Sequence, residues 1–173
     1  SSQERADDYG SLDPTQKPVV DEVSSWAQAA ISVKGEIPSL RHLLLGTAGV
    51  GESKVIKCIL AVCDRIFGSP DHVVVTAHTG IACKNIGLGA QTINSLFKIR
   101  GDAYSKVEPL TGPAETQLIN RFGDVWLLIF GGISMVSNVQ FPPFRSVWSR
   151  RKKVIFADGN GEQSRGTECW RAV

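Results

Sequence analysis

The fold of this chain is decided by the stretch Gly46-Thr47-Ala48-Gly49-Val50-Gly51-Glu52-Ser53. It follows the apolar run Leu43-Leu44-Leu45 and leads into a segment whose apolar residues recur at helical spacing. Strand, glycine-rich turn and helix in this order are the layout of a phosphate-binding loop, whose pattern is G-x-x-x-x-G-K-[ST]. Every position of the pattern is present except the lysine, which Glu52 replaces.

The replacement of the lysine changes the chemistry that the loop can perform. In such a loop, backbone N–H groups turn inward around a phosphate, and the helix N-terminus adds partial positive charge. The lysine would reach the β and γ phosphates, and Ser53 would hold Mg²⁺. Lys54 cannot stand in, because it lies about 200° around the helix from position 52. The stretch therefore predicts a nucleotide-binding fold without a working nucleotide site.

Composition is that of one ordinary globular domain. The chain has 173 residues, of which 42% are apolar and 21% charged, and its net charge of +2 does not require a nucleic-acid partner. Four cysteines show no C-x-x-C pair and no zinc spacing, so we expect structural thiols and a reducing compartment. The N-terminus is unlike a secretory signal, and no apolar run approaches the ~20 residues that span a bilayer. We expect a soluble intracellular protein with no membrane partner.

Residues 1–11 are expected to be a disordered lead, followed by a helix. Asp13 is placed as the N-cap and Gln16 as its capping-box partner, three residues later. The helix should bury one face, formed by Val19, Val20, Val23, Trp26, Ala27, Ala30 and Ile31. Gln16 has a second interpretation, as a glutamine that reads adenine ahead of a phosphate loop, since an amide both donates and accepts.

Strand and helix patterns alternate through the rest of the chain. A second amphipathic helix follows the loop, with Val55, Ile56, Ile59, Leu60, Cys63, Ile66 and Phe67 on its apolar face. Strands are expected at 43–45, 72–76, 125–130 and 153–158, and shorter helices at 81–85 and 114–121. This alternation predicts a three-layer α/β/α domain with a mainly parallel sheet.

Five stretches, taken together, resemble one family. Over about 12–135, and up to 158 at most, the chain resembles the N-terminal motor domain of the Pif-type (petite integration frequency) DNA helicases, superfamily-one enzymes that move 5′ to 3′ on single strands. The stretches occur in the family's order: Leu12-Asp13-Pro14-Thr15-Gln16, the phosphate loop at 46–53, the segment 77–86 similar to A-P-T-G-x-A-A, the segment 91–99 similar to T-I-H-S-L, and 127–135 similar to L-L-I-I-D-E-I-S-M.

This resemblance implies a RecA-like fold, the first motor domain only, spanning 12–158. It implies ATP and Mg²⁺ as cofactors, held by Gln16, by Gly46, Thr47, Ala48, Gly49, Val50, Gly51 and Glu52 of the loop, and by Ser53 as the metal ligand. The implied activity is ATP-dependent DNA unwinding in repair, recombination and telomere maintenance, in the nucleus or mitochondrion. The residues implied to grip single-stranded DNA are Thr79, Gly80, Thr92, Asn94 and Ser95, for which plain turn and cap chemistry is the alternative.

The departures from the family pattern lie where the chemistry should be. Besides Glu52, Gly131 and Gly132 occupy the positions of the acidic pair that holds Mg²⁺ and polarises the attacking water. Asn94 stands where the family has histidine, and Cys83 where it has alanine. After 158 the pattern is faint: we expect 159–173 to form an irregular tail, and we expect the second motor domain with its arginine finger to be missing. We therefore predict that no catalytic residue is intact and that the chain is an inactive monomer.

Other functions remain open from the sequence. The chain can be a module that binds single-stranded nucleic acid without nucleotide hydrolysis, or a protein-interaction remnant without a ligand. A further alternative is that the departures belong to this particular chain, while close relatives keep the lysine and the acidic pair.

Overall fold

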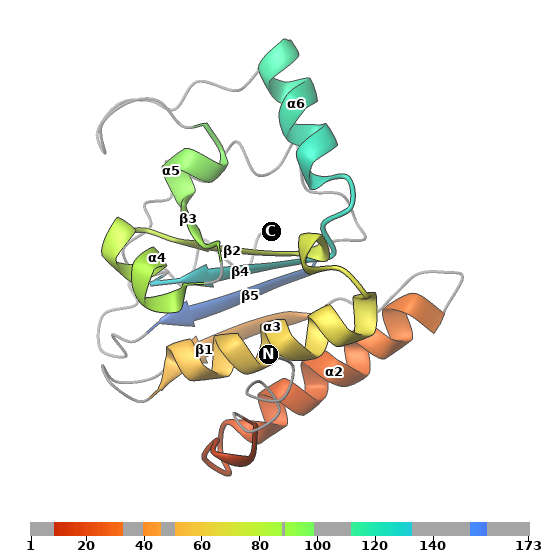
Figure 1. Ribbon diagram of the computed structural model, residues 1–173, viewed down its shortest axis with the longest axis vertical. Coiled ribbons are helices and arrows are strands. Elements are labelled where there is room, and N and C mark those ends of the chain that lie inside the picture. Colours follow the sequence, from red (N-terminus) through yellow and green to blue (C-terminus); the bar gives the residue numbers. More distant parts are fainter. Residues whose placement is uncertain are drawn as a thin grey trace.

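The computed structural model describes residues 9–32, 40–45, 51–87, 89–98, 112–132 and 153–158 (Figure 1). Its helices are α2 (Lys17–Ser32), α3 (Glu52–Phe67), α4 (Gly80–Ile86), α5 (Ile93–Leu96) and α6 (Pro113–Phe122), with a 3₁₀ turn at Pro70–His72. Its strands are β1 (Arg41–Leu45), β2 (Val73–Ala77), β3 (Gln91–Thr92), β4 (Leu127–Gly131) and β5 (Lys153–Asp158). Loop residues 46–50, the first eight residues of the expected lead, and the expected tail at 159–173 lie outside the described residues.

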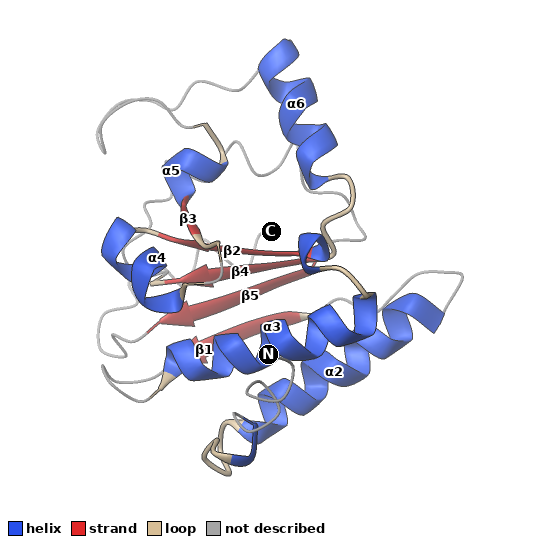
Figure 2. Cartoon of the chain, in the orientation of Figure 1, coloured by secondary structure: helices blue, strands red, loops and turns tan. Residues whose placement is uncertain are grey.

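Five strands form one sheet in the order β1-β5-β4-β2-β3, and every pairing between them is parallel (Figure 2). Because parallel strands run the same way, their carboxyl ends meet at a single edge of the sheet. Strand β5 lies between β1 and β4, so the strand expected at 153–158 is present and belongs to this sheet. Short β3 escaped the sequence pattern, because two residues carry no periodicity.

The strands at the centre of the sheet are apolar on both faces. All five residues of β4 are buried, as are all residues of β2 except half-buried Val74. Such continuous apolar runs are typical of inner parallel strands covered on both sides. The expected bounds shift by one or two residues: His72 belongs to the 3₁₀ turn, which Ser69 caps, and Val125 precedes β4.

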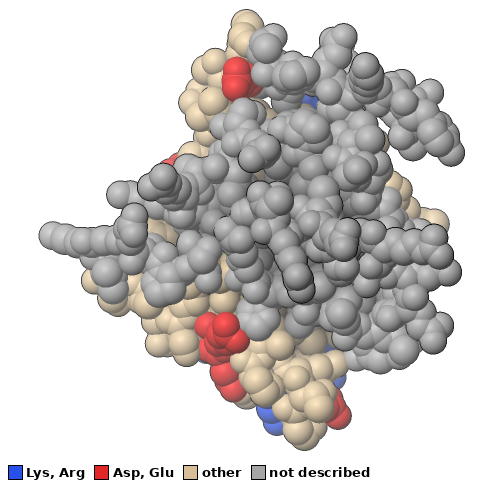
Figure 3. All heavy atoms as spheres, turned by 180° about the vertical axis from the view of Figure 1, so that it is seen from behind, with Lys and Arg blue, Asp and Glu red and all other residues tan. Residues whose placement is uncertain are grey.

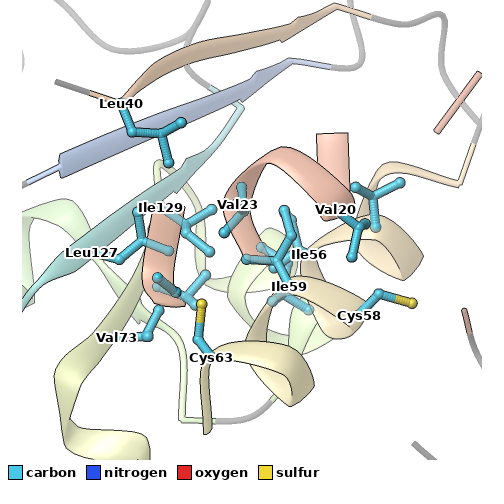
Figure 4. Close-up of a cluster of buried hydrophobic side chains, with 14 of the residues drawn as sticks. Val20, Val23, Leu40, Ile56, Cys58, Ile59, Cys63, Val73, Leu127 and Ile129 are labelled. Atoms are coloured by element: carbon cyan, nitrogen blue, oxygen red, sulfur yellow. The ribbon is translucent and has the colours of Figure 1, made fainter. Parts of the chain in front are cut away.

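Helices α2 and α3 lie side by side over one face of the sheet (Figure 1). Figure 4 shows their apolar side chains meeting those of β2 and β4, with Val20 and Val23 from α2 and Ile56 and Ile59 from α3. Ile59 is 0% exposed. Burying a large aliphatic side chain stabilises a fold by about 1.5–3 kcal/mol, so this interface contributes much of the free energy of folding.

The expected buried face of α2 is wrong at its last residue. Ile31 has the spacing of the core positions, yet it is 56% exposed. It is the penultimate residue of α2, where the helix has passed beyond its neighbour (Figure 1). Helix α3 ends as predicted, with Gly68 at φ 74° donating its N–H to the Asp64 carbonyl oxygen.

Helix α6 is attached to the β3–α5 region by two contacts. The rings of Phe97 and Phe122 stack with centroids 5.2 Å apart and an interplanar angle of 7°. The guanidinium of Arg121 donates to Gln91 Oε1 at 2.9 Å. In the part of the chain that the structure describes, no helix is long and apolar enough to cross a membrane.

We predict that Ile59→Ala lowers the free energy of unfolding by about 2–5 kcal/mol, because it leaves a cavity between α3, α2 and the sheet. Ile31→Ala is the matched control, since it removes the same atoms from an exposed position and should change stability by less than about 0.5 kcal/mol. Urea unfolding followed by circular dichroism measures both. Equal losses in the two variants would contradict the described core.

Candidate functional site

The predicted site residues converge on the carboxyl edge of the sheet. Leu45, which directly precedes the phosphate loop, pairs with Asp158 at the end of β5. Gly131, at the end of β4, pairs with Ala77 at the end of β2. Crevices outside the carboxyl ends of strands are where open α/β sheets bind ligands. The topology therefore brings Leu45, Gly131 and the start of the 77–86 segment to one edge of the sheet.

Gln16 lies directly against the end of the phosphate loop. Gly51 adopts φ 86° and ψ 21°, a left-handed conformation that favours glycine. A Cβ atom added at Gly51 would lie 3.3 Å from Gln16 Nε2. The Gln16 amide therefore lies beside Gly51, where the chain enters α3, although a whole helix and strand separate the two residues in the sequence.

Both interpretations of Gln16 are compatible with its surroundings. Its Oε1 accepts a hydrogen bond from the Asp13 N–H at 3.1 Å, while Asp13 Oδ1 accepts from the Thr15 N–H at 2.9 Å and from Thr15 Oγ1 at 2.7 Å. The two hydrogen bonds from Thr15 lower the pKa of the Asp13 carboxyl below its ordinary value. The hydrogen bonds of the expected capping box are therefore present, but they stabilise a turn at 13–16, and α2 begins at Lys17, three residues later than an N-cap at Asp13 predicts. This turn positions the side chain that an adenine-reading role would use.

Glu52 and Ser53 open α3. Both are half-buried, and Glu52 is the acidic residue of the first turn. A carboxylate there is favourable by roughly 0.3–1 kcal/mol, because it faces the positive end of the helix dipole. The next residue, Lys54, is held by its Nζ donating to the Ser11 carbonyl oxygen at 2.8 Å. Residues 9–11, which the sequence assigns to the lead, are thus tied to the helix that follows the loop.

Gly131 and Gly132 differ in what a side chain would meet. A Cβ at Gly131 would lie 3.0 Å from Ile86 Cδ1 and 3.7 Å from Ala77 Cβ, so an acid there requires the Ile86 methyl to shift. Gly132 has open space, with nothing within 4 Å of an added Cβ, but its φ of +68° strains any other residue. Sequence reasoning missed Ile86, because an isolated apolar residue before Gly87 carries no sign of contact with β4.

The residues implied to grip single-stranded DNA lie on neighbouring elements, because β3 pairs with β2 and is followed by α5. Thr79 Oγ1 accepts from the Ala82 N–H at 3.1 Å and caps α4, and Thr92 Oγ1 accepts from the Ser95 N–H at 3.3 Å and caps α5. The expected cap chemistry is therefore present. Each threonine O–H can still donate, and Gly80, Asn94 and Ser95 are exposed beside them.

The cysteines in the described part of the chain are buried. They are Cys58, Cys63 and Cys83, all as free thiols. Burial raises the pKa of the Cys63 thiol to about 12 and also raises the pKa of Cys83, which disfavours the reactive thiolate. Among the described residues, no three His, Cys, Asp or Glu side chains are grouped so as to hold a metal ion. These thiols are therefore structural residues of the hydrophobic core.

Seen from behind the view of Figure 1, the described part of the surface carries charges of both signs at its lower end. Figure 3 shows acidic and basic side chains side by side at the lower end of that view, where residues 9–16 and the start of α2 lie. Mixed charge of this kind is typical of a solvated face rather than of a nucleic-acid surface.

Comparison with solved structures identifies Pif1 helicases as structural neighbours. A structure from work on unwinding of forked double-stranded DNA by two coordinating Pif1 helicases is 20% identical, covers 93% of this chain and 38% of that chain, and gives a TM-score of 0.58. Pif1 helicase from Bacteroides, in complex with ADP-AlF3 and single-stranded DNA, is 18% identical, with 93% and 36% coverage and a TM-score of 0.56. Pif1 helicase from Candida albicans is 21% identical, covers 86% of this chain and 32% of that chain, and gives a TM-score of 0.52.

These similarities confirm the predicted fold, a RecA-like α/β domain with a parallel sheet, and the structural resemblance to Pif1 helicases. The chain spans less than two fifths of the length of each of these three structures. No protein-family model matches the chain, and no curated protein matches it.

We predict that Gly51→Ala destabilises the protein more than Gly68→Ala does. Both positions have positive φ, at 86° and 74°, so both variants incur the cost of a left-handed alanine, about 1–2 kcal/mol. A Cβ atom added at Gly51 would lie 3.3 Å from Gln16 Nε2, whereas a Cβ atom added at Gly68 would have nothing within 4 Å. Thermal unfolding measures the difference, which Gln16→Ala in the Gly51→Ala background should remove. Equal destabilisation by both alanines would show that Gln16 does not lie against the loop.

Proposed function

We propose that this chain is a Pif-type helicase motor domain that no longer hydrolyses ATP. Its parent activity, by resemblance, is ATP-dependent unwinding of DNA in repair, recombination and telomere maintenance. The observation that carries the proposal is the position of Gln16 beside Gly51, next to a helix whose first residue is Glu52 instead of lysine: a Cβ atom added at Gly51 would lie 3.3 Å from Gln16 Nε2.

Electrostatics determine the consequence of that charge. At about 4 Å and an effective dielectric constant of about 20, a carboxylate and one phosphate charge repel by about 4 kcal/mol. A lysine at the same place would attract by a similar amount. Glu52 is half-buried, so solvent screens part of this difference, but its sign opposes a triphosphate in either case.

Hydrolysis needs further groups that this chain lacks. Phosphoryl transfer depends almost entirely on positioning and on stabilising charge with lysine, Mg²⁺ and arginine. Ser53 would be the residue to hold Mg²⁺, which would neutralise charge on the transferring phosphate. The positions of the acidic pair are Gly131 and Gly132, and glycine has no side chain to contribute. Each lost element of this kind typically raises the barrier by a few kcal/mol.

We predict that Glu52→Lys restores nucleotide binding without restoring hydrolysis. The affinity for a fluorescent ATP analogue with Mg²⁺ should rise at least about tenfold over the unaltered chain, because repulsion becomes attraction. Glu115→Lys is the matched control, since it makes the same charge change in the first turn of α6. Fluorescence anisotropy measures binding, and phosphate release measures hydrolysis.

Three outcomes of this experiment separate the possibilities. Failure of both the unaltered chain and Glu52→Lys to bind would mean that the frame around Gln16 does not form a pocket. Micromolar binding of the ATP analogue by the unaltered chain would contradict the inference that Glu52 prevents nucleotide binding. DNA-stimulated ATP hydrolysis by the unaltered chain would overturn the proposal of inactivity altogether.

A second candidate function is binding of single-stranded nucleic acid without hydrolysis. The specific observation in its favour is that Thr79 and Thr92 cap the helices that follow the paired strands β2 and β3, and that Gly80, Asn94 and Ser95, directly after these caps, are exposed. Short hydroxyls and backbone amides bond sugar and phosphate, which holds a strand without reading its sequence.

We predict that Ser95→Ala weakens binding of an oligo-dT strand about three- to tenfold, the effect of one hydrogen bond of about 0.5–1.5 kcal/mol. The variant keeps the Ser95 N–H that Thr92 accepts, so α5 remains capped. Ser25→Ala on α2 is the control, because its hydroxyl donates to the Asp21 carbonyl oxygen far from this edge. Anisotropy titrations over a range of salt concentrations measure the affinity. No salt-sensitive binding by the intact chain would leave a protein-interaction remnant as the better account.

A further inference from the structure

Residues 9–16 precede α2 and are fastened to the helix that follows the phosphate loop. Half-buried Lys54 of α3 donates from Nζ to the Ser11 carbonyl oxygen at 2.8 Å. The next residue, Leu12, is 4% exposed and belongs to the hydrophobic core. The middle of this segment is therefore anchored both by a hydrogen bond from a charged group and by a buried side chain.

The same segment approaches α3 a second time at Gln16. A Cβ atom added at Gly51 would lie 3.3 Å from Gln16 Nε2, and the backbone N–H of Lys54 donates to the Gly51 carbonyl oxygen at 2.9 Å. Between these two points the segment closes on itself, because the Asp13 N–H donates to Gln16 Oε1 at 3.1 Å. The Lys54 ammonium and the Gln16 amide thus lie at the two ends of a short segment that is held against a single turn of α3.

Tyr9, at the start of the segment, contacts a different helix. Its hydroxyl donates to Asp21 Oδ1 at 2.6 Å, and Lys17 Nζ lies over its ring, 5.8 Å from the centroid. Both partners belong to α2, so these contacts fix the beginning of the segment to α2. Lys54, by contrast, couples the segment to the helix that follows the phosphate loop.

We propose that Lys54 is a positioning residue: its bond to the Ser11 carbonyl oxygen keeps the Gln16 amide beside Gly51, and through Gln16 it sets the preference of the candidate nucleotide site for adenine over guanine. This inference rests on the proposed function and on the adenine-reading interpretation of Gln16. An amide accepts from the amino group of adenine and donates to N7, whereas guanine presents a carbonyl oxygen in place of that amino group. Discrimination between the two bases therefore depends on where the amide is held.

A direct effect of the Lys54 charge on phosphates is a different role and predicts a different result. The ammonium donates to Ser11, and position 54 lies about 200° around α3 from position 52. A positive charge attracts the triphosphates of adenine and guanine nucleotides alike, so its loss would weaken both by the same factor. The ratio of the two affinities therefore separates positioning of the amide from attraction of the phosphates.

The binding test uses the Glu52→Lys background, with ATP and GTP analogues that carry the fluorophore on the ribose and leave the base free. Glu52→Lys should prefer the adenine analogue by at least about tenfold, and Lys54→Met added to it should reduce the preference to less than about threefold, the loss of one hydrogen bond. Lys54→Arg should restore the preference, because a guanidinium also donates to a carbonyl oxygen. Lys57→Met changes an exposed lysine of the same helix and should keep the preference. Inorganic tripolyphosphate should compete equally well with the Lys54→Met and Lys57→Met proteins.

Hydrogen exchange tests the same contact without a nucleotide. The backbone N–H of Gln16 donates to the Asp13 carbonyl oxygen at 2.9 Å, so its exchange rate reports opening of the turn at 13–16. In the otherwise unaltered chain, Lys54→Met should raise this rate at least about tenfold, since a hydrogen bond from a charged group is lost. Lys57→Met should leave the rate unchanged.

Each other outcome identifies which statement fails. Unchanged exchange in Lys54→Met would overturn this inference, whatever the nucleotide analogues do. Faster exchange with an unchanged preference for adenine would show that Lys54 only stabilises the turn, and would overturn its positioning role. Equal binding of both analogues by the Glu52→Lys protein would overturn the inference and leave the proposed function standing. Binding of neither analogue would overturn the proposed function and the base preference with it, and the exchange rates would still decide whether Lys54 holds the segment.

Discussion

Parallel pairing of the five strands is the constraint on which the other features depend. Register aligns Leu44, Ala157, Gly131, Ala77 and Thr92 across the sheet in one row, so residues from five distant segments end at the same edge. Parallel strands require crossover connections, and those connections carry the helices that cover the sheet. Any functional group on a turn that follows β1, β2 or β4 is consequently brought to that edge, whatever chemistry it retains.

The N-terminal segment complements this edge from outside the sheet. Gln16 reaches Gly51 because the turn at Asp13 directs its side chain, and Lys54 holds the same segment through the Ser11 carbonyl. The left-handed conformation of Gly51 and the nearby amide reinforce each other, since any Cβ at that position would meet the amide. The Gln16 side chain that closes the turn at Asp13 is thus the same side chain that lies beside Gly51.

The order and type of the long elements could be predicted from the sequence. Hydrophobic periodicity indicates which residues of an element are buried, and glycine caps mark where helices end. The two-residue strand β3 and the exposure of Ile31 could not be predicted, since one has no period and the other depends on where a neighbouring helix ends. In the candidate site, the motif names positions in the sequence, but it gives no information about contacts between distant segments. Nothing in the local sequence around Ile86 shows that its terminal methyl group lies 3.0 Å from the place of a Cβ on Gly131.

The proposed loss of ATP hydrolysis is compatible with a stable fold, because the buried core and the positions of the nucleotide motif are different residues. The buried side chains of α2, α3, β2 and β4 supply the free energy of folding, and none of the departures removes one of them. Clustered charges at an active site generally cost stability, so replacing acids with glycine relieves repulsion, and Glu52 gains from the dipole of α3. Selection for folding alone would therefore keep the glycines of the turn and the core, and would not keep lysine or aspartate. The polar groups that remain exposed on the turns after β2 and β3 are not needed for the core either, and that is why binding at those turns is the informative measurement.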